Sequence, residues 1–358
     1  MEVIQGFRLS PQQRRVWLLQ RESRAYRSQC AISIDGPLDI SVLTTTVHRL
    51  IERHEILRTT FECLPGMKIP VQVTKDEVTH SLCEVDFSDQ PAAERSSLVD
   101  QLFDGMHLQT FDSELSVAGR YTLVRLSPVE HVLLISLPAL CADKQTLNNL
   151  VGEVTRLYQE SEELEETVQY AQFSAWQHEL LEENDDAAAR EFWRKQASFG
   201  APSLKLPLES SPTEISTFTP RTHTLKLEAD NPRIANSVFL FTCWHSLLQR
   251  LTKQDDIAIK YLCTGRVYEE MSEAFGLYDR WPLLHSQFEE GERLTKVLEQ
   301  IDRTVTDACE WQEYYPGGDE VDESIGFDFT EQPAAQVAGD VRFSIKRQYS
   351  RAHVPRMP

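Results

Sequence analysis

The sequence predicts an α/β (α+β) protein built from two related lobes, and three observations support this fold class. Helix and strand patterns alternate along both halves of the chain. The length of 358 residues exceeds a typical domain of ~150 residues. A polar, proline-bearing stretch over residues 199–220 has little periodicity and separates the halves. We therefore expect an N-terminal lobe over residues 1–180, a helix and linker over 181–220, and a C-terminal lobe over 221–358.

The first half carries clear start and stop signals. Ser10 and Pro11 supply an N-cap and a first-turn proline, and Gly36-Pro37 ends the alternating strand QCAISID. Ser41 caps a one-sided apolar helix, and SPVE is a hairpin turn between two later strands. The expected elements are a helix from Pro11, a strand over 29–35, a helix from Ser41, a short helix over 98–103, strands over 120–126 and 131–137, and a helix over 147–158.

Two helices, over residues 172–183 and 187–197, lead into the linker, and the second half then repeats the alternation. The elements expected beyond the linker are a strand over 222–228, a helix over 233–251, a strand over 256–262, a helix over 292–310, and strands near 324–329 and 341–348.

Composition and charge exclude several classes of function. Hydrophobic residues make up 41% of the chain and charged residues 26%, as in ordinary globular proteins. The net charge of −20 repels phosphate backbones and anionic lipids, so neither nucleic acid nor a membrane is an expected partner. Seven scattered cysteines without C-x-x-C spacing indicate reduced thiols, and no signal peptide or apolar span is present. These features predict a cytoplasmic protein.

Several segments are similar to the core motifs of one enzyme family. SPQQRRVWL (10–18) looks like its first motif, and RHEILRTTF (53–61) matches its second motif at every fixed position. YAQFSAWQ (170–177) resembles its fourth motif, while Gly265-Arg266 is also typical of the family and FGLYDRWPLL (275–284) is a weak echo of the fifth motif without its Asn-Thr pair. On these residues the chain resembles a condensation domain of a nonribosomal peptide synthetase.

The resemblance implies two chloramphenicol-acetyltransferase-like lobes in a V-shaped pseudo-dimer with a central tunnel. Carrier proteins insert phosphopantetheine arms into such a tunnel, and an acceptor amine there attacks a donor thioester. No cofactor is bound directly. A third motif, His-His-x-x-x-Asp-Gly, lies at the tunnel centre, and its second histidine is the usual group that orients or deprotonates the amine.

This third motif is degenerate in the present chain, which reads PALCADK over residues 138–144. With Asp143 on the motif aspartate, Pro138 and Ala139 replace both histidines and Lys144 replaces the glycine. A register one residue earlier puts Leu137 and Pro138 there, and neither register supplies a base. The resemblance implies that Ala139, Leu140 and Cys141 line the substrate tunnel.

Other candidate groups favour structural interpretations. Cys141 is a nucleophile only if its thiol pKa is lowered, and a buried apolar cysteine is the commoner case. His131 lies eight residues before Ala139, roughly 26 Å away along the same strand, so it cannot reach the tunnel centre. The remaining histidines considered lie in settings typical of core residues: His54, His178, His245 and His285. The acidic residues Asp319, Glu320, Asp322 and Glu323 are expected to be solvated loop charges, so no metal site is predicted.

Asp143 is expected to have a structural role. The resemblance implies an ion pair with an arginine of the second motif, with Arg58 preferred and Arg53 as the runner-up. The alternative is that Asp143 only caps the helix that follows it.

The leading functional hypothesis is a catalytically impaired condensation domain that acts as a structural or carrier-protein-interaction module. Its expected partners are peptidyl or aminoacyl carrier proteins and a neighbouring adenylation domain, and its early first motif places it at the start of a synthetase. The C-terminal lobe is expected to be incomplete at its end. The alternatives are an active acyltransferase that forms an amide or ester by proximity alone, and a recruitment platform for a tailoring enzyme.

Overall fold

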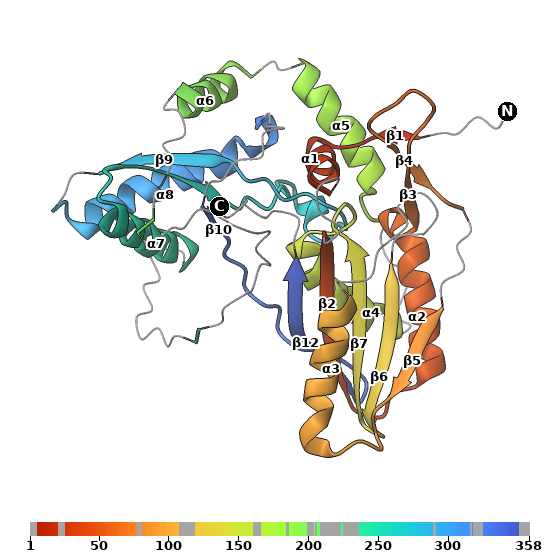
Figure 1. Cartoon of the computed structure of the whole chain (residues 1–358). Helices are drawn as coiled ribbons and strands as arrows, with labels where there is room; N and C mark the ends of the chain where they lie inside the picture. The colour runs from red at the N-terminus through yellow and green to blue at the C-terminus, as the bar shows by residue number, and fades with distance from the viewer. Residues whose placement is uncertain are drawn as a thin grey trace.

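The structure is a computed structural model of the whole chain (Figure 1). It describes most of the sequence. The described residues are 6–20, 26–76, 81–106, 119–159, 166–183, 186–198, 204, 206–207, 223–224, 236–288, 291–315, 317 and 325–350.

A six-stranded sheet forms the first half of the molecule. All its neighbouring strands are antiparallel except β5 and β6, which are parallel. The strands in spatial order are β11 (Gln336–Ala338), β12 (Val341–Ser350), β2 (Arg27–Asp35), β7 (Glu130–Pro138), β6 (Arg120–Ser127) and β5 (Leu82–Asp86).

Helices cover both faces of this sheet. The helix α3 (Ala92–Met106) packs on one face, while α2 (Ile40–Arg53) and α4 (Lys144–Tyr158) pack on the other. Because β7 is central and covered on both sides, seven consecutive residues of its sequence HVLLISL are buried. The expected strand 131–137 and helix 147–158 are therefore both present, and they lead directly into and out of the third-motif loop, residues 138–143.

The last strand that the structure describes joins the first sheet. β12 pairs with β2 along eight registered residue pairs, from Arg342 opposite Asp35 to Ser350 opposite Ser28. Figure 1 shows the blue β12 beside the red β2, although they lie at opposite ends of the sequence. The expected assignment of all residues 221–358 to a C-terminal lobe is therefore corrected, because β12 completes the hydrogen-bonding of β2, which would otherwise be a sheet edge.

A three-stranded sheet organises the second half. Its order is β10 (Gly326–Phe327), β8 (Asp256–Tyr261) and β9 (Leu283–Gln287). The helices α7 (Asn236–Thr252) and α8 (Leu294–Glu310) pack against it, and α6 (Ala187–Ser198) adds Trp193 to the same core. The strand β9 was not predicted, because its sequence LLHSQ is short and follows a proline.

Smaller elements link the two halves. A three-stranded sheet contains β1 (Phe7–Arg8), β4 (Val71–Thr74) and β3 (Thr59–Glu62). The helices α1 (Pro11–Gln20) and α5 (Tyr170–Glu183) lie nearby, and three single 3-10 turns are η1 (Glu55–Arg58), η2 (Glu269–Met271) and η3 (Gln312–Tyr314).

Most expected elements are found, with shifted ends. The short helix over 98–103 is the longer α3, and the strand near 324–329 is reduced to the two residues of β10. Of the strand expected over 222–228, only residues 223 and 224 are described, and they belong to no helix or strand. The acidic group Asp319, Glu320, Asp322 and Glu323 lies outside the described residues. Within the described part of the chain, no helix combines the length and apolarity needed to cross a bilayer.

Candidate functional site

The backbone of the third-motif loop is held by one hydrogen bond within the loop and by two bonds to residues 26–28. The Ala139 amide donates to the Tyr26 carbonyl at 3.2 Å, and the Cys141 amide donates to the Pro138 carbonyl at 2.9 Å. The Ala142 carbonyl accepts a 2.6 Å bond from the Ser28 hydroxyl. These bonds fix a tight turn between β7 and α4.

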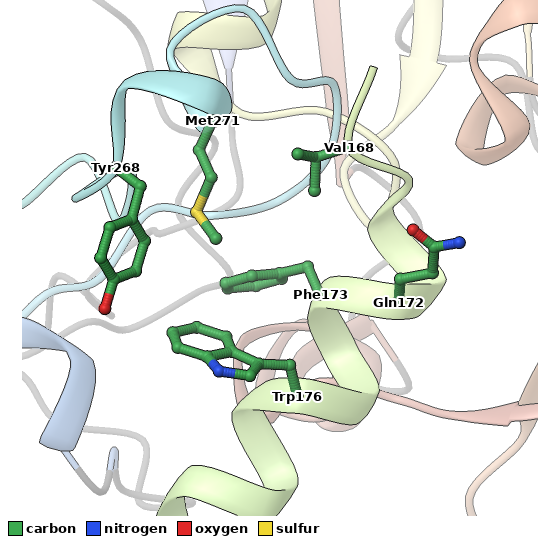
Figure 2. Close-up of a pocket in the computed structure, with 6 residues that line it drawn as sticks. All are labelled: Val168, Gln172, Phe173, Trp176, Tyr268 and Met271. Atoms are coloured by element: carbon green, nitrogen blue, oxygen red, sulfur yellow. The ribbon is translucent and has the colours of Figure 1, made fainter. Parts of the chain in front are cut away.

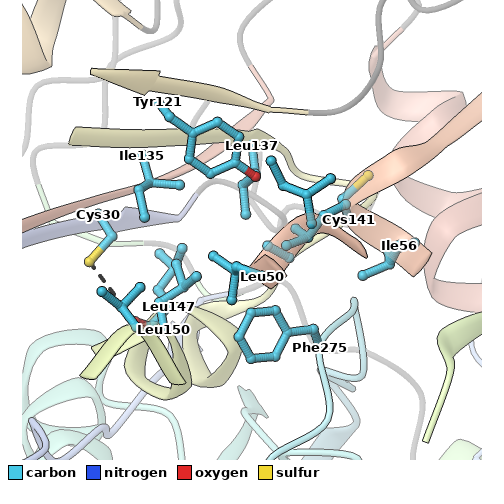
Figure 3. Packing of buried hydrophobic residues seen from close by; sticks show 14 of the residues in the cluster. Cys30, Leu50, Ile56, Tyr121, Ile135, Leu137, Cys141, Leu147, Leu150 and Phe275 are labelled. Atoms are coloured by element: carbon cyan, nitrogen blue, oxygen red, sulfur yellow. Dashed lines mark hydrogen bonds between the residues drawn. The ribbon is translucent and has the colours of Figure 1, made fainter. Parts of the chain in front are cut away.

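The side chains of this loop belong to the hydrophobic core. Ala139, Leu140 and Cys141 have exposed fractions of 0%, 2% and 0%, and all three lie in the main apolar cluster. Figure 3 shows Cys141 among side chains that include Leu50 of α2 and Phe275 of the second half. Close packing leaves these side chains almost no surface in contact with solvent, and their place beside a substrate tunnel stays a prediction.

Burial also decides the chemistry of Cys141. It raises the pKa of the Cys141 thiol well above its ordinary value, since the charged thiolate loses its hydration in the core. At neutral pH the sulfur is a protonated thiol. Cys141 therefore behaves as a small apolar core residue and not as a nucleophile.

Asp143, the next residue but one, is fully buried and fully hydrogen-bonded. One carboxylate oxygen, Oδ1, accepts bonds from the Thr146 amide (2.8 Å) and hydroxyl (2.8 Å), which caps α4. The other, Oδ2, accepts a 2.8 Å bond from the Tyr278 amide. The Arg266 guanidinium donates to both oxygens, at 2.7 and 2.9 Å. Asp143 therefore caps a helix and also forms a two-pronged ion pair.

The partner of Asp143 is not one of the expected arginines. Arg53 lies 2.8 Å from Glu153, and Arg58 bonds to the Lys75 carbonyl and lies 3.6 Å from Glu55. The contacts of both arginines follow from the position of the second motif, which ends α2 and forms η1. Asp143 lies elsewhere, at the start of α4. The expected pairs of Asp143 with Arg58 and Arg53 are therefore corrected to a pair with Arg266.

Arg266 is positioned by its own surroundings. Its side chain is 3% exposed and lies over the Tyr278 ring, with its guanidinium carbon 4.4 Å from the ring centroid. Burial acts to lower the pKa of Arg266, but the Asp143 carboxylate outweighs burial and raises that pKa. The preceding Gly265 has a φ of 67°, and a Cβ there would lie 2.0 Å from the Tyr278 carbonyl oxygen.

The segment 274–278 of the second half docks on the start of α4. The Asp143 amide donates to the Gly276 carbonyl at 3.0 Å, and the Thr146 hydroxyl lies 2.9 Å from the same carbonyl oxygen. Gly276 has a φ of 152°, and a Cβ there would overlap the Tyr170 ring at 1.9 Å. The residues Ala274, Phe275, Leu277 and Tyr278 complete the main apolar cluster of the first half.

The second motif forms a buried ionic cluster around Glu153 of α4. Glu153 lies 2.8 Å from Arg53, 3.0 Å from His54 and 2.7 Å from Arg156. Burial acts to raise the pKa of Glu153, but the hydrogen bond from His54 and the charge of Arg156 lower it to about 2. His54 also stacks on Phe275 at 3.8 Å, and burial lowers its own pKa. Its role is therefore structural.

The first and fourth motifs meet in a second polar network. The Ser10 hydroxyl lies 2.7 Å from the Tyr170 hydroxyl, which donates to the Leu277 carbonyl at 2.6 Å. The side-chain nitrogen of Gln13, Nε2, donates to the Leu140 carbonyl at 3.0 Å and to the Gln72 side-chain oxygen at 3.1 Å. These motif residues hold the third-motif loop and the second half of the chain in place.

The other histidines lie outside the loop. His131 lies near the start of β7, at the end of the strand away from the third-motif loop. His178 lies 2.8 Å from the Leu9 carbonyl oxygen. Burial lowers the pKa of His245 to about 4, and His285 lies 3.1 Å from Asp256. The third-motif loop itself contains no imidazole. Among the described residues, no group of three or more His, Cys, Asp or Glu side chains has a metal-binding arrangement.

An apolar pocket of about 300 Å³ opens between α5 and η2 (Figure 2). The rings of Trp176 and Tyr268 lie 6.0 Å apart in an edge-to-face arrangement, and Phe173 lies 5.9 Å from Trp176. Met271 points between them. The lining residues are Val168, Gln172, Phe173, Trp176, Tyr268 and Met271. This surface can take an apolar group, and among its six lining residues only Tyr268 has a titratable side chain.

Comparison with known proteins identifies the family. A family model described as "Condensation domain" matches residues 3–319. This chain belongs to the condensation-domain family. Surfactin synthase subunit 1 of Bacillus subtilis (strain 168) is 26% identical over 321 residues, and tyrocidine synthase 2 of Brevibacillus parabrevis is 24% identical over 319 residues. Each alignment covers 86% of this chain but only 9% of the much longer synthetase.

Solved structures share the fold of this condensation domain. The starter condensation domain of rhizomide synthetase RzmA matches with a TM-score of 0.81 at 14% identity, covering 96% of this chain and 82% of that chain. SgcC5 from Streptomyces globisporus matches with a TM-score of 0.76 at 18% identity, covering 97% and 88%. The expected mixed α/β fold of condensation-domain type is thereby confirmed. The V shape and the central tunnel stay predictions.

Arg266 is the site residue whose role in the condensation domain was missed. The sequence placed Gly265-Arg266 among the family-like segments, and that match was the available signal. Its pairing with Asp143 spans 123 positions in the sequence, and no local pattern predicts such a contact. Glu153 was missed for a similar reason, because it lies in a regular helix and carries no motif of its own.

Proposed function

We propose that this condensation domain is catalytically impaired and serves as a structural or carrier-protein-interaction module of nonribosomal peptide assembly. One observation carries the proposal. The loop that would present the catalytic histidine contains no imidazole, and its Ala139, Leu140 and Cys141 side chains are packed in the core.

Amide formation from a thioester and an amine needs a group that orients the amine and accepts its proton. A positioned general base contributes about 10²–10⁴ in rate. Alanine and proline side chains have no such group, and the pKa of the Cys141 thiol is raised by burial. The absence of such a group from the third-motif loop supports the proposal.

The contacts around the loop support a retained scaffold. Asp143 and Arg266 join the two halves of the chain through a buried ion pair, and Ser10, Gln13 and Tyr170 add buried hydrogen bonds. The proposed partners are carrier proteins, whose phosphopantetheine arms bring the acyl groups, and a neighbouring adenylation domain. No cofactor is bound directly.

A reconstitution assay tests the proposal. A donor carrier protein with an acyl thioester is mixed with an aminoacyl acceptor carrier protein and the chain, and amide formation is followed by intact mass. The native chain is compared with the variant Pro138→His, Ala139→His and Lys144→Gly. The variant Ala142→His is the matched control, because it adds an imidazole to the same buried loop outside the motif position.

We expect the native chain and the control to form no more amide than a mixture without the chain. Amide formation by the repaired variant alone would also support lost chemistry on an intact fold. Amide formation by the native chain well above background would overturn the proposal and establish an acyltransferase that works by proximity.

A binding measurement tests the second half of the proposal. The immobilised chain is exposed to carrier protein with and without its phosphopantetheine arm. Saturable binding supports a carrier-protein-interaction module. No binding of either form would leave only the structural role.

A further inference from the structure

Two cysteines of the second half lie close together in space. Cys263 follows β8 and forms a backbone bridge with Arg280, with both amide–carbonyl distances at 2.9 Å. Cys309 lies at the end of α8, 46 positions later in the sequence. Their sulfur atoms are 3.9 Å apart. Both thiols are free, and both side chains belong to or pack against the apolar cluster of the second half.

The two thiols differ in exposure and in acidity. Cys309 is half-buried, whereas Cys263 is 1% exposed. A hydrogen bond between them lowers the pKa of Cys309 and raises that of Cys263. Because the thiolate is the reactive form of cysteine, Cys309 is the accessible and more reactive member, and Cys263 is placed to react with it second.

We propose that Cys263 and Cys309 form a dithiol–disulfide modification site that is oxidised by a hydroperoxide such as hydrogen peroxide. In the first step the Cys309 thiol loses its proton, and its thiolate attacks one oxygen of hydrogen peroxide. The O–O bond breaks to give a sulfenic acid and hydroxide, and the hydroxide takes up the released proton as water. In the second step the Cys263 sulfur attacks the Cys309 sulfur, and the S–O bond breaks. The Cys263 proton leaves with the hydroxyl group as water. In sum, two thiols and one peroxide give one disulfide and two waters, and the two sulfurs lose two electrons in total.

The geometry permits the new bond with local movement. A disulfide needs its sulfurs ~2.0 Å apart, about half their present separation. Cys309 lies in the last turn of α8, next to its final residue, Glu310. The backbone carbonyls of a last helical turn have no partner within the helix, so this end is less constrained than the middle. A rotation of the Cys309 side chain and a small shift of this end therefore bring the sulfurs together.

Gln312 connects the cysteine pair to the contact between the two halves. Its side-chain nitrogen donates to the Cys309 carbonyl at 2.7 Å, and its side-chain oxygen accepts from the Gly265 amide at 2.9 Å. Its own carbonyl accepts a bond from Arg280. Gly265 precedes Arg266, the partner of Asp143. Oxidation therefore cross-links the segment that positions Arg266 to the end of α8, and it closes a long loop in the second half.

Peptide mapping of the oxidised full chain tests the proposal directly. Trypsin releases Cys263 in the peptide 261–266 and Cys309 in the peptide 304–342, and neither contains another cysteine. After mild peroxide treatment and alkylation, we expect these two peptides as one linked species that separates on reduction. The intact chain should lose the mass of two hydrogen atoms. Thermal unfolding should shift upward by roughly 5 °C, because the cross-link restricts the unfolded chain.

Variants separate the pair from general cysteine oxidation. Cys309→Ser should abolish both the linked peptide and the thermal shift, whereas Cys83→Ser, which removes an exposed cysteine elsewhere, should leave both intact. The native-chain map does not depend on any variant folding. Recovery of both peptides unlinked from the native chain, with Cys309 oxidised to a sulfinic acid or unmodified, would overturn the proposal. This test involves no carrier protein, so its outcome is independent of the proposed function.

Discussion

The loop segment 138–142 and the residue after it, Asp143, are adjacent in sequence and opposite in chemistry. The segment adds Ala139, Leu140 and Cys141 to the hydrophobic core and offers no group that transfers a proton at neutral pH. Asp143 is equally buried, yet both of its carboxylate oxygens accept hydrogen bonds, from Thr146, Tyr278 and Arg266.

The difference shows that one motif can carry two separable roles. The segment 138–142 contributes apolar packing, whereas Asp143 joins α4 to the second half of the chain. Whatever group precedes it in the motif, Asp143 is needed for stability, because a buried charge without its partner is strongly destabilising. Substitutions in the segment 138–142 and at Asp143 should therefore have effects of different kinds and sizes.

Breaking the ion pair should have the largest effect. Asp143→Ala leaves Arg266 charged, buried and unpaired, and it also removes the cap of α4. We expect a loss of about 3–5 kcal/mol in the free energy of unfolding, measured by urea denaturation. Asp328→Ala is the matched control, since Asp328 pairs with Lys144 at 31% exposure. A loss below about 1 kcal/mol for Asp143→Ala would refute the structural role of the pair.

The buried ionic cluster around Glu153 of α4 should make the stability of the protein sensitive to acid. The pKa of Glu153 is about 2 in the folded chain against an ordinary value of 4.5, so its contribution is fully present above pH 4.5 and is lost as the pH falls towards 2. The shift corresponds to at most about 3 kcal/mol at neutral pH, because part of it requires the protonated form of His54. His54 acts in the same direction, because burial lowers its pKa too.

Urea denaturation between pH 7 and about pH 3 measures this sensitivity. Glu153→Gln should be less stable at neutral pH and should lose less stability on acidification. If both proteins showed the same pH dependence, the ionic cluster would not be the source of the acid sensitivity.

Restoring a histidine in the apolar segment should cost less than removing the ion pair. Ala139→His forces an imidazole into a site with 0% exposure, so we expect a loss of about 1–3 kcal/mol from overpacking and from a poorly hydrogen-bonded ring. Thermal or urea unfolding measures it. A neutral or stabilising effect would mean that space exists beside Ala139, which would support a tunnel at this position.

The smallest effect is expected at Lys144, the residue that follows Asp143. Lys144 replaces the motif glycine and pairs with Asp328 at 2.9 Å, with both side chains 31% exposed. Because partly exposed ion pairs contribute little, Lys144→Ala should change the free energy of unfolding by less than about 1 kcal/mol. A large loss, comparable with that of Asp143→Ala, would show that the ion pair of Lys144 with Asp328 is also needed for stability.

By itself the sequence determined the local features of this protein. The alternation of apolar and polar residues predicted most helices and strands, since periodicity reports which side of an element is buried. RHEILRTTF was enough to indicate the family, and PALCADK was enough to show that no histidine is present. These conclusions depend on residue identity and on near neighbours along the chain.

The tertiary structure alone decided the contacts between distant segments. Every arginine has the same charge, so only packing selected Arg266 over Arg58 and Arg53 as the partner of Asp143. The hydrogen-bonding needs of β2 placed β12 in the first sheet, and the close packing of two halves buried Ala139, Leu140 and Cys141. Each of these outcomes depends on which surfaces meet in space, and that information is not contained in any single stretch of sequence.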